Sequence, residues 1–202
     1  MTNPDPDHRI PPAWMRMSEA AWLGARAWRG FGHLGARGPN DGPPALVLPG
    51  FIANDRTTLE LRRALARAGW RVHPWALGWS LGGVYAREVA RAHPGKIAAV
   101  VTLGSPFSGD PKLNNVWRLY ERVAGHKVDA PPVPRDPSKP PVPTLAIWSR
   151  ADGIVAPISA RGLPHESDKA VELKCSHMAF GVSRQVTERV ATEIGKFVKA
   201  PL

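Results

Sequence analysis

Short apolar runs alternate with amphipathic stretches along most of the chain. A continuous apolar run, such as residues 45–48, indicates a strand buried on both faces of a parallel sheet, and apolar residues repeated every three or four positions indicate a helix. The expected strands are residues 45–48, 71–77, 97–103, 144–148 and 171–174. The expected helices are residues 57–68, 81–92 and a last one in which Val182, Val186, Val190 and Ile194 step by four. This alternation predicts an α/β fold.

Two segments interrupt or precede the alternation. Residues 12–31 carry Trp14, Met17 and Trp28 at roughly helical intervals, which predicts a leading helix. Residues 108–143 contain a short helical piece around 116–123 and then the run APPVPRDPSKPPVP, whose prolines exclude a helix or a sheet interior. We interpret residues 1–202 as one domain, with 108–143 as a cap-like insert on an extended stalk.

Length and composition restrict the class of protein. The chain has 202 residues, 43% hydrophobic and 22% charged, which fits one globular domain and excludes a disordered polyelectrolyte. Its longest apolar runs are far shorter than the roughly 20 residues that cross a bilayer, so no integral membrane association is expected. The first ten residues do not resemble a secretory signal, and the single Cys175 suits a reducing compartment. We therefore expect a cytoplasmic protein.

The net charge of +10 would suit an anionic partner. However, the arginines are scattered over predicted helix faces, with no RNA-binding aromatic motif and no zinc-finger spacing. Nucleic acid is therefore not an expected partner. A lone cysteine also leaves no zinc site built from cysteines, and no metal or cofactor is expected.

Residues 78–82, GWSLG, match the G-x-S-x-G nucleophile elbow. The motif lies between strand 71–77 and helix 81–92, which is the context that such an elbow requires. The serine occupies a sharp, strained turn, so its neighbours must be small to let strand and helix approach. The pentapeptide alone would equally suit a glycine turn with a surface serine, but its context favours Ser80 as a nucleophile.

A nucleophilic serine needs a histidine base that is oriented by a carboxylate. Asp152 follows strand 144–148 and His177 follows strand 171–174, at the sheet edge where active sites of parallel sheets form. Each residue alone would more often be an ordinary loop residue, but their order and placement together make them the candidate acid and base. His73, inside a strand, and His93, at a helix end, are weaker candidates for the base.

The reaction also needs two backbone donors for an oxyanion and a pocket for the substrate. Leu81, after the serine, and Phe51, in the loop after the first strand, occupy the donor positions. The candidate pocket residues are Phe51, Trp79, Phe107, Trp117, Tyr120, Met178 and Phe180. Core packing is the alternative role for each of them, although Trp117 and Tyr120 lie in the insert and are preferred as lid contacts. Cys175 is expected to be a buried, inert thiol.

The chain carries LVLPGF, GWSLGGVYAREVA, VVTLGSPFSG, IWSRADGIV and SHMAFG in this order between residues 46 and 181. In these five stretches and their order, the chain resembles the α/β-hydrolases, specifically small bacterial esterase- or lipase-type members. The resemblance implies Ser80 as nucleophile and Asp152 and His177 as acid and base. It also implies Phe51 and Leu81 as the oxyanion donors.

The chain departs from this family before the elbow. Family members place a helix and a further central strand there, whereas here HPWAL runs straight into GWSLGG. Strand 71–77 must then carry the nucleophile itself, and Pro74, which lacks an N–H, predicts a bulge or weak pairing. Because parallel crossovers are right-handed, placing strand 71–77 on the opposite side of strand 45–48 would move helix 57–68 to the other sheet face. A rearrangement or an exchange of strands between subunits is the alternative. We therefore expect a reduced α/β-hydrolase fold of about five mostly parallel strands, with the leading helix in place of the usual first strands.

The expected activity is hydrolysis of carboxylic esters through an acyl-enzyme on Ser80, with a small-molecule ester as substrate. The short insert leaves little lid area, which favours short to medium acyl chains. A thioesterase or acyltransferase is the nearest alternative, and a catalytically weak binding or scaffold protein is the alternative from another class. The shortened sheet should expose apolar surface and strand edges, which predicts a homo-oligomer.

Overall fold

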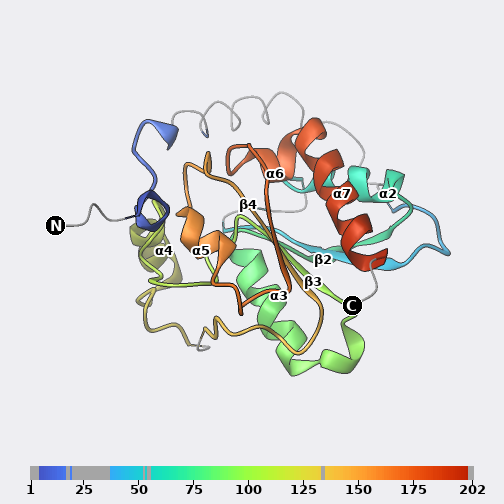
Figure 1. The fold of residues 1–202 in the computed structure, drawn as a ribbon, viewed down its shortest axis with the longest axis horizontal. Helices are drawn as coiled ribbons and strands as arrows, with labels where there is room; N and C mark the ends of the chain where they lie inside the picture. Colours follow the sequence, from blue (N-terminus) through green and yellow to red (C-terminus); the bar gives the residue numbers. More distant parts are fainter. Residues whose placement is uncertain are drawn as a thin grey trace.

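A five-stranded parallel sheet with helices on both faces forms the centre of the computed structural model (Figure 1). The structure describes residues 5–16, 19, 37–51, 53, 56–132 and 135–199. The strands, which pair in chain order, are β1 (Pro44–Leu48), β2 (Arg71–Trp79), β3 (Val100–Leu103), β4 (Thr144–Trp148) and β5 (Lys169–Glu172). All five expected strands are present, so the predicted α/β fold is confirmed.

Six α-helices and two short 3-10 helices are found in the described part of the chain. The α-helices are α2 (Leu59–Arg67), α3 (Leu81–Ala92), α4 (Trp117–Ala124), α5 (Pro157–Arg161), α6 (Ala179–Val182) and α7 (Arg184–Lys199). The 3-10 helices are η1 (Pro6–His8) and η2 (Pro94–Lys96). Most of the expected leading helix, 12–31, lies outside the described residues. No helix in the described ranges is long and apolar enough to span a membrane.

The helices form two layers. On one face of the sheet, α2, α6 and α7 contact one another, and on the other face α3 packs against β1, β2 and β3. The core on the first face includes Val47, Leu61, Leu65, Val101, Leu103, Leu145, Ile147, Val190 and Ile194. The core on the second face includes Val84, Ala86, Ala90, Val100, Phe107, Val142 and Ala146. Successive strand residues therefore point to opposite layers, as the two-residue period of a strand requires.

The two edge strands differ from their sequence-based expectations. In β1, Leu46 is 37% exposed between the buried Ala45 and Val47, so the prediction that this strand is buried on both faces is wrong. In β5, the strand begins at Lys169 rather than at 171. Both strands stand at the ends of the sheet order, so each pairs with just one of the other strands that the structure describes. Charged and half-exposed side chains are tolerated in an edge strand, so a continuous apolar run does not mark where such a strand begins and ends.

The register of β2 breaks next to Pro74. Val47 of β1 pairs with Pro74, but the next residue, Leu48, pairs with Gly78, so residues 75–77 have no partner on β1. On its other side, β2 pairs with β3 only through Gly78 and Trp79. The prediction of a bulge or weak pairing next to Pro74 is therefore confirmed, and pairing resumes at Gly78, directly before the serine elbow.

The helices α2 and α3 lie on opposite faces of the sheet. The chain nevertheless moves in the same direction across the sheet when it passes from β1 to β2 and from β2 to β3. Two such connections have the same hand only when their helices cover the same face. One connection is therefore left-handed, and the expectation of right-handed crossovers throughout is wrong. Helix α2 stays on the α7 side of the sheet because it buries its apolar residues Leu61 and Leu65 there.

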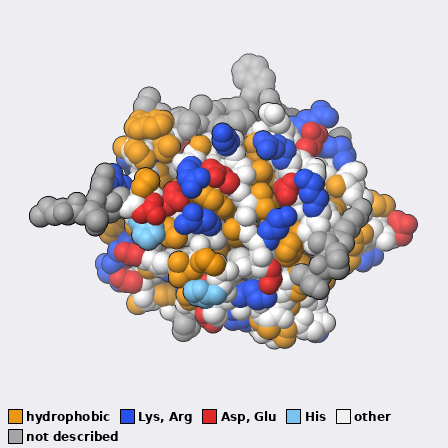
Figure 2. Space-filling model, viewed as in Figure 1, with side chains coloured by type: hydrophobic (Ala, Val, Ile, Leu, Met, Phe, Trp, Pro, Cys, Tyr) orange, Lys and Arg blue, Asp and Glu red, His pale blue; other side chains and the backbone are white. Residues whose placement is uncertain are grey.

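Buried arginine holds the proline-rich stalk of the insert against α3. Arg87 Nη2 donates to the carbonyl oxygens of Pro137, Ser138 and Glu166 at 2.8 to 3.0 Å, and its guanidinium lies 4.1 Å from the ring centre of Phe107. Burial, and then the charge of Arg91, lower the pKa of Arg87 to about 10, so it stays charged at neutral pH. On the face shown in Figure 2, Lys and Arg side chains lie among acidic and apolar side chains.

Arg87→Ala should lower the free energy of unfolding by about 2–4 kcal/mol, because the carbonyl groups of Pro137, Ser138 and Glu166 lose a buried charged donor. Urea unfolding followed by circular dichroism measures this loss. The control Arg122→Ala, on the exposed side of α4, should change the stability by less than about 0.5 kcal/mol. Equal unfolding midpoints for the two variants would contradict this account of the stalk.

Candidate active site

Ser80 occupies the turn between β2 and α3 with a positive φ. Its φ of 55° and ψ of −128° make it the one non-glycine residue with positive φ in the described ranges. Its N–H donates to the Leu103 carbonyl at 2.9 Å, and its own carbonyl accepts from the N–H of Gly83 at 3.0 Å. Such a conformation is strained for an L-residue and persists where the surroundings hold it. The turn thus has the geometry that the sequence motif predicts.

The glycines around the elbow are required because α3 and the neighbouring strands approach one another closely there. A Cβ on Gly78 would lie 2.0 Å from the Cα of Gly83, and a Cβ on Gly83 would lie 2.0 Å from Ser105 Oγ. At Gly82, a Cβ would lie 2.6 Å from the Leu48 carbonyl oxygen. Any larger side chain would therefore push α3 away from the strands that position Ser80.

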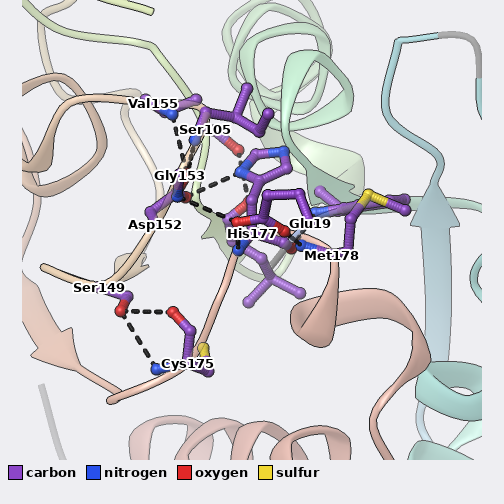
Figure 3. A network of polar contacts seen from close by, with 12 residues as sticks. Glu19, Ser105, Ser149, Asp152, Gly153, Val155, Cys175, His177 and Met178 are labelled. Carbon is purple, nitrogen blue, oxygen red and sulfur yellow. Dashed lines mark hydrogen bonds and ion pairs between the residues drawn. The ribbon is translucent and has the colours of Figure 1, made fainter. Parts of the chain in front are cut away.

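Asp152 and His177 meet at the carboxyl ends of β4 and β5 (Figure 3). Nδ1 of His177 lies 2.8 Å from Asp152 Oδ2, and the side chains are 5% and 1% exposed. The other carboxylate oxygen, Oδ1, accepts the N–H groups of Ile154 and Val155, both at 2.8 Å. An ionised carboxylate only accepts, so Nδ1 carries a proton and Nε2 is left as the basic nitrogen.

The charge balance around His177 favours its protonated form. Burial lowers the pKa of His177, but the charge and hydrogen bond of Asp152, together with the charge of Glu19, raise it by more. The net result is a pKa above the ordinary histidine value. A base with a raised pKa binds a proton from a serine hydroxyl more strongly.

The acid and base lie next to the serine elbow. Trp79 Nε1 donates to the His177 carbonyl at 3.2 Å, and the two ring centres are 5.6 Å apart. A Cβ on Gly104 would lie 2.8 Å from Asp152 Oδ2 and 3.2 Å from His177 Nδ1, and the preceding carbonyl is the one that binds the N–H of Ser80. The Ser80 hydroxyl forms no hydrogen bond with His177, nor with any other residue in the part of the chain that the structure describes. The Asp152–His177 pair therefore lies close to the residues that flank and hold the serine elbow.

A cavity of about 420 Å³ opens beside Ser80, between α3 and the insert. Its polar lining residues, apart from Ser80, are Glu88, Asn114, His126 and Arg135. The rest of the lining is Phe51, Leu81, Val84, Tyr85, Val89, Pro106, Pro111, Val116, Trp117, Tyr120, Val128, Pro131, Pro132 and Val155. The site is thus largely apolar, with few polar groups, as small-molecule sites usually are.

The two expected oxyanion donors both reach this cavity. Phe51 and Leu81 line it next to Ser80, and a Cβ on Gly50 would lie only 3.0 Å from the Cβ of Ser80. Neither the Phe51 N–H nor the Leu81 N–H donates to another described residue. Phe51 and Leu81 therefore stay candidates for the two backbone donors that an oxyanion site requires.

The expected pocket residues divide into two groups. Phe51, Trp117 and Tyr120 line the cavity, and the rings of Phe51 and Tyr120 are 5.4 Å apart. Trp79, Phe107, Met178 and Phe180 are not among the residues that line this cavity, so their contact with a substrate stays a prediction.

These four residues pack in or against the core instead. Trp79 and Phe180 are buried between the sheet and the α2–α7 layer, and Met178 packs against the same cluster. Phe107 is fully buried under the guanidinium of Arg87. An apolar residue near a catalytic motif can face the core or the pocket, and sequence spacing does not separate the two.

Two residues that the sequence motifs did not mark hold the acid and histidine loops. Ser149 Oγ donates to the Cys175 carbonyl at 2.7 Å and accepts the N–H groups of Cys175 and Ala151 at 3.2 and 3.0 Å. Glu19, from the N-terminal segment, accepts backbone N–H groups of both loops. Ser149 is part of the IWSRAD stretch, but no local pattern distinguishes Glu19 from a surface glutamate.

Cys175 lies buried between these groups. Burial, followed by the charges of Asp152 and Glu19, raises the pKa of its thiol to about 12. The thiol is therefore neutral at physiological pH, and the expectation that Cys175 is buried is confirmed.

Neither the family models nor the curated protein sequences match this chain. Among solved structures, an α/β hydrolase enzyme from the metagenome of sediments of the lagoon of Mar Chica, Morocco, superposes with a TM-score of 0.57 at 19% identity, over 79% of this chain and 92% of its own. The esterase domain of a Rhodothermus marinus protein gives 0.55 at 21% identity, over 79% and 88%. A carboxylesterase from Bacillus subtilis gives 0.54 at 14% identity, over 82% and 86%. With the parallel sheet and the serine elbow in place, these similarities show that the chain has the α/β-hydrolase fold.

Proposed function

We propose that the protein is a serine hydrolase that cleaves carboxylic esters with short to medium acyl chains. The observation that carries the proposal is a strained Ser80 that lines an apolar cavity, while the buried Asp152–His177 pair packs against Gly104, next to the residue whose carbonyl binds the Ser80 N–H. An esterase domain and a carboxylesterase are among the structural neighbours, which supports carboxylic esters as the substrate class.

The proposed reaction runs in two halves. His177 Nε2 takes the proton of the Ser80 hydroxyl while Oγ attacks the ester carbonyl carbon. The Leu81 and Phe51 N–H groups bind the resulting oxyanion, and Asp152 stabilises the imidazolium. The intermediate then expels the alcohol, which takes the proton from His177. Water, activated by the same histidine, hydrolyses the acyl-enzyme and regenerates Ser80.

The cavity supports the proposed acyl range. Its volume of about 420 Å³ lies near the lower end of small-molecule sites, which span roughly 300–1,000 Å³. The insert limits it on one side through Trp117, Tyr120 and the prolines at 131 and 132. A short acyl chain can be fully enclosed there, whereas a long chain would extend into water.

A fluorophosphonate should label Ser80, and Ser80→Ala should lose both the label and ester turnover by a factor of about 10³ or more. Peptide mass spectrometry locates the label. Ser183→Ala, a matched change outside the site, should keep wild-type labelling and turnover. Label on Ser105 or Ser149, or no label on the folded protein, would count against the assignment.

The pH dependence of kcat/KM should report His177. Only the neutral imidazole accepts a proton, so activity is low below the His177 pKa and rises to a plateau above it. Because that pKa is raised, the midpoint should lie above the ordinary value of about 6.5. Asp152→Asn removes the main source of the raised value and should move the remaining activity to lower pH, with a large loss of turnover. A midpoint below 6.5 in the unmodified protein would contradict this charge balance.

Initial rates on p-nitrophenyl esters of increasing chain length should peak at short to medium chains. Val89→Trp would add bulk to a lining position on α3 and should shift the peak to shorter chains. Val123→Trp, on exposed α4 surface outside the lining, should leave the profile unchanged. A maximum at long chains with activation at an oil interface would instead indicate a lipase.

A further inference from the structure

The N-terminal segment is anchored beside the loop that carries the acid. Asp7 is buried and forms ion pairs with Arg150 at 3.3 Å and with Arg161 at 3.1 Å. Asn115 Nδ2 donates to the Pro11 carbonyl at 2.9 Å and to the Gly153 carbonyl at 2.8 Å. The segment is therefore bound to the loop after β4, to α5 and to the start of the insert before it reaches Glu19.

Glu19 is 4% exposed and ends directly on the catalytic loops (Figure 3). Its Oε1 accepts the N–H of Gly153 at 3.0 Å and the N–H of His177 at 2.7 Å. Its Oε2 accepts the N–H of Met178 at 2.8 Å. One carboxylate thus binds the residue after the acid, the base itself and the residue after the base. Three backbone donors satisfy a charge that would otherwise be costly to bury.

A glycine at position 153 allows this contact. A Cβ there would lie 2.7 Å from the Met15 carbonyl oxygen and 3.0 Å from Glu19 Oε1. The first clash involves backbone, which cannot rotate away as a side chain can. Gly153 therefore permits the N-terminal segment to approach close enough for Glu19 to reach both loops.

We propose that Glu19 is a positioning residue for the reaction, which sets the Asp152–His177 geometry through the backbone and stabilises the imidazolium with its negative charge. The inference rests on the proposed function. Ser149 and the Asp152–His177 pair already join the two loops, so Glu19 is not needed merely to keep them together. Its distinct contributions are the orientation of the His177 main chain and a second negative charge beside the base.

The charged groups that act on His177 in the described part of the chain are Asp152 and Glu19. Trp79 packs on the ring without a charge, and the thiol of Cys175 is neutral. Neutralising Glu19 therefore removes one of two negative charges and leaves the direct partner of Nδ1 in place.

The test compares Glu19→Gln with Glu193→Gln, which removes the same charge from an exposed pair with Lys196 on α7. The midpoint of the pH profile of kcat/KM and the titration of the His177 ring, followed by NMR, should both move down in Glu19→Gln by about half a unit or more. The value of kcat should fall about tenfold with little change in KM, because the base loses orientation rather than substrate contacts. Glu193→Gln should show neither effect.

A folded Glu19→Gln variant with an unchanged His177 titration and unchanged kcat would overturn the proposal, even if its melting temperature were lower. Glu19→Ala should lower kcat further, by about a hundredfold. If that variant fails to fold, Glu19→Gln, which keeps the shape and one acceptor oxygen, decides the question. The NMR titration reports on Glu19 whether or not esters are substrates, whereas absence of fluorophosphonate labelling in the unmodified protein would reject the proposed function instead.

Discussion

The buried hydrogen bond between Asp152 and His177 is the interaction on which the site depends. A carboxylate and an imidazole that are almost fully enclosed must satisfy each other, since leaving either charge unpaired in the interior would cost several kcal/mol. The neighbouring parallel strands β4 and β5 bring the two loops to the same edge of the sheet. Ser149 and Glu19 then bind the remaining backbone groups, so that the pair is held from the sheet side and from the N-terminal segment.

The backbone conformation of Ser80 is maintained by contacts with α3 and with Leu103 rather than by regular strand pairing. Its strained turn follows β2, a weakly paired strand. β2 pairs with β3 only at its last two residues, and its register with β1 breaks between Pro74 and Gly78. The close approach of α3, which the elbow glycines allow, and the bond to the Leu103 carbonyl hold the turn instead. The register break and the opposite hands of the two flanking connections fit our interpretation that one strand–helix unit of the usual hydrolase fold is missing here.

The sequence was sufficient to predict that Ser80, Asp152 and His177 lie at one edge of the sheet. Each of them comes shortly after a predicted parallel strand, and the carboxyl ends of such strands meet at one edge. The sequence could not sort Trp79 from Trp117, because both are apolar and near the motif, and only the tertiary structure turns one to the core and the other to the cavity. Glu19 was missed for a related reason. Its partners lie 134 to 159 positions away, and no local periodicity encodes such contacts. The β5 bounds shifted because an exposed edge strand needs no continuous apolar run.

Direct detection of the acyl-enzyme tests the central claim, that the buried acid–base pair activates Ser80 towards esters. The protein would be mixed with p-nitrophenyl acetate or butyrate, quenched in acid within milliseconds to seconds, and digested for peptide mass spectrometry. The account predicts one acyl group per chain on the peptide that contains Ser80, and its absence when His177 is replaced by alanine. An acyl group on another residue, or equal acylation of Ser80 without His177, would contradict it.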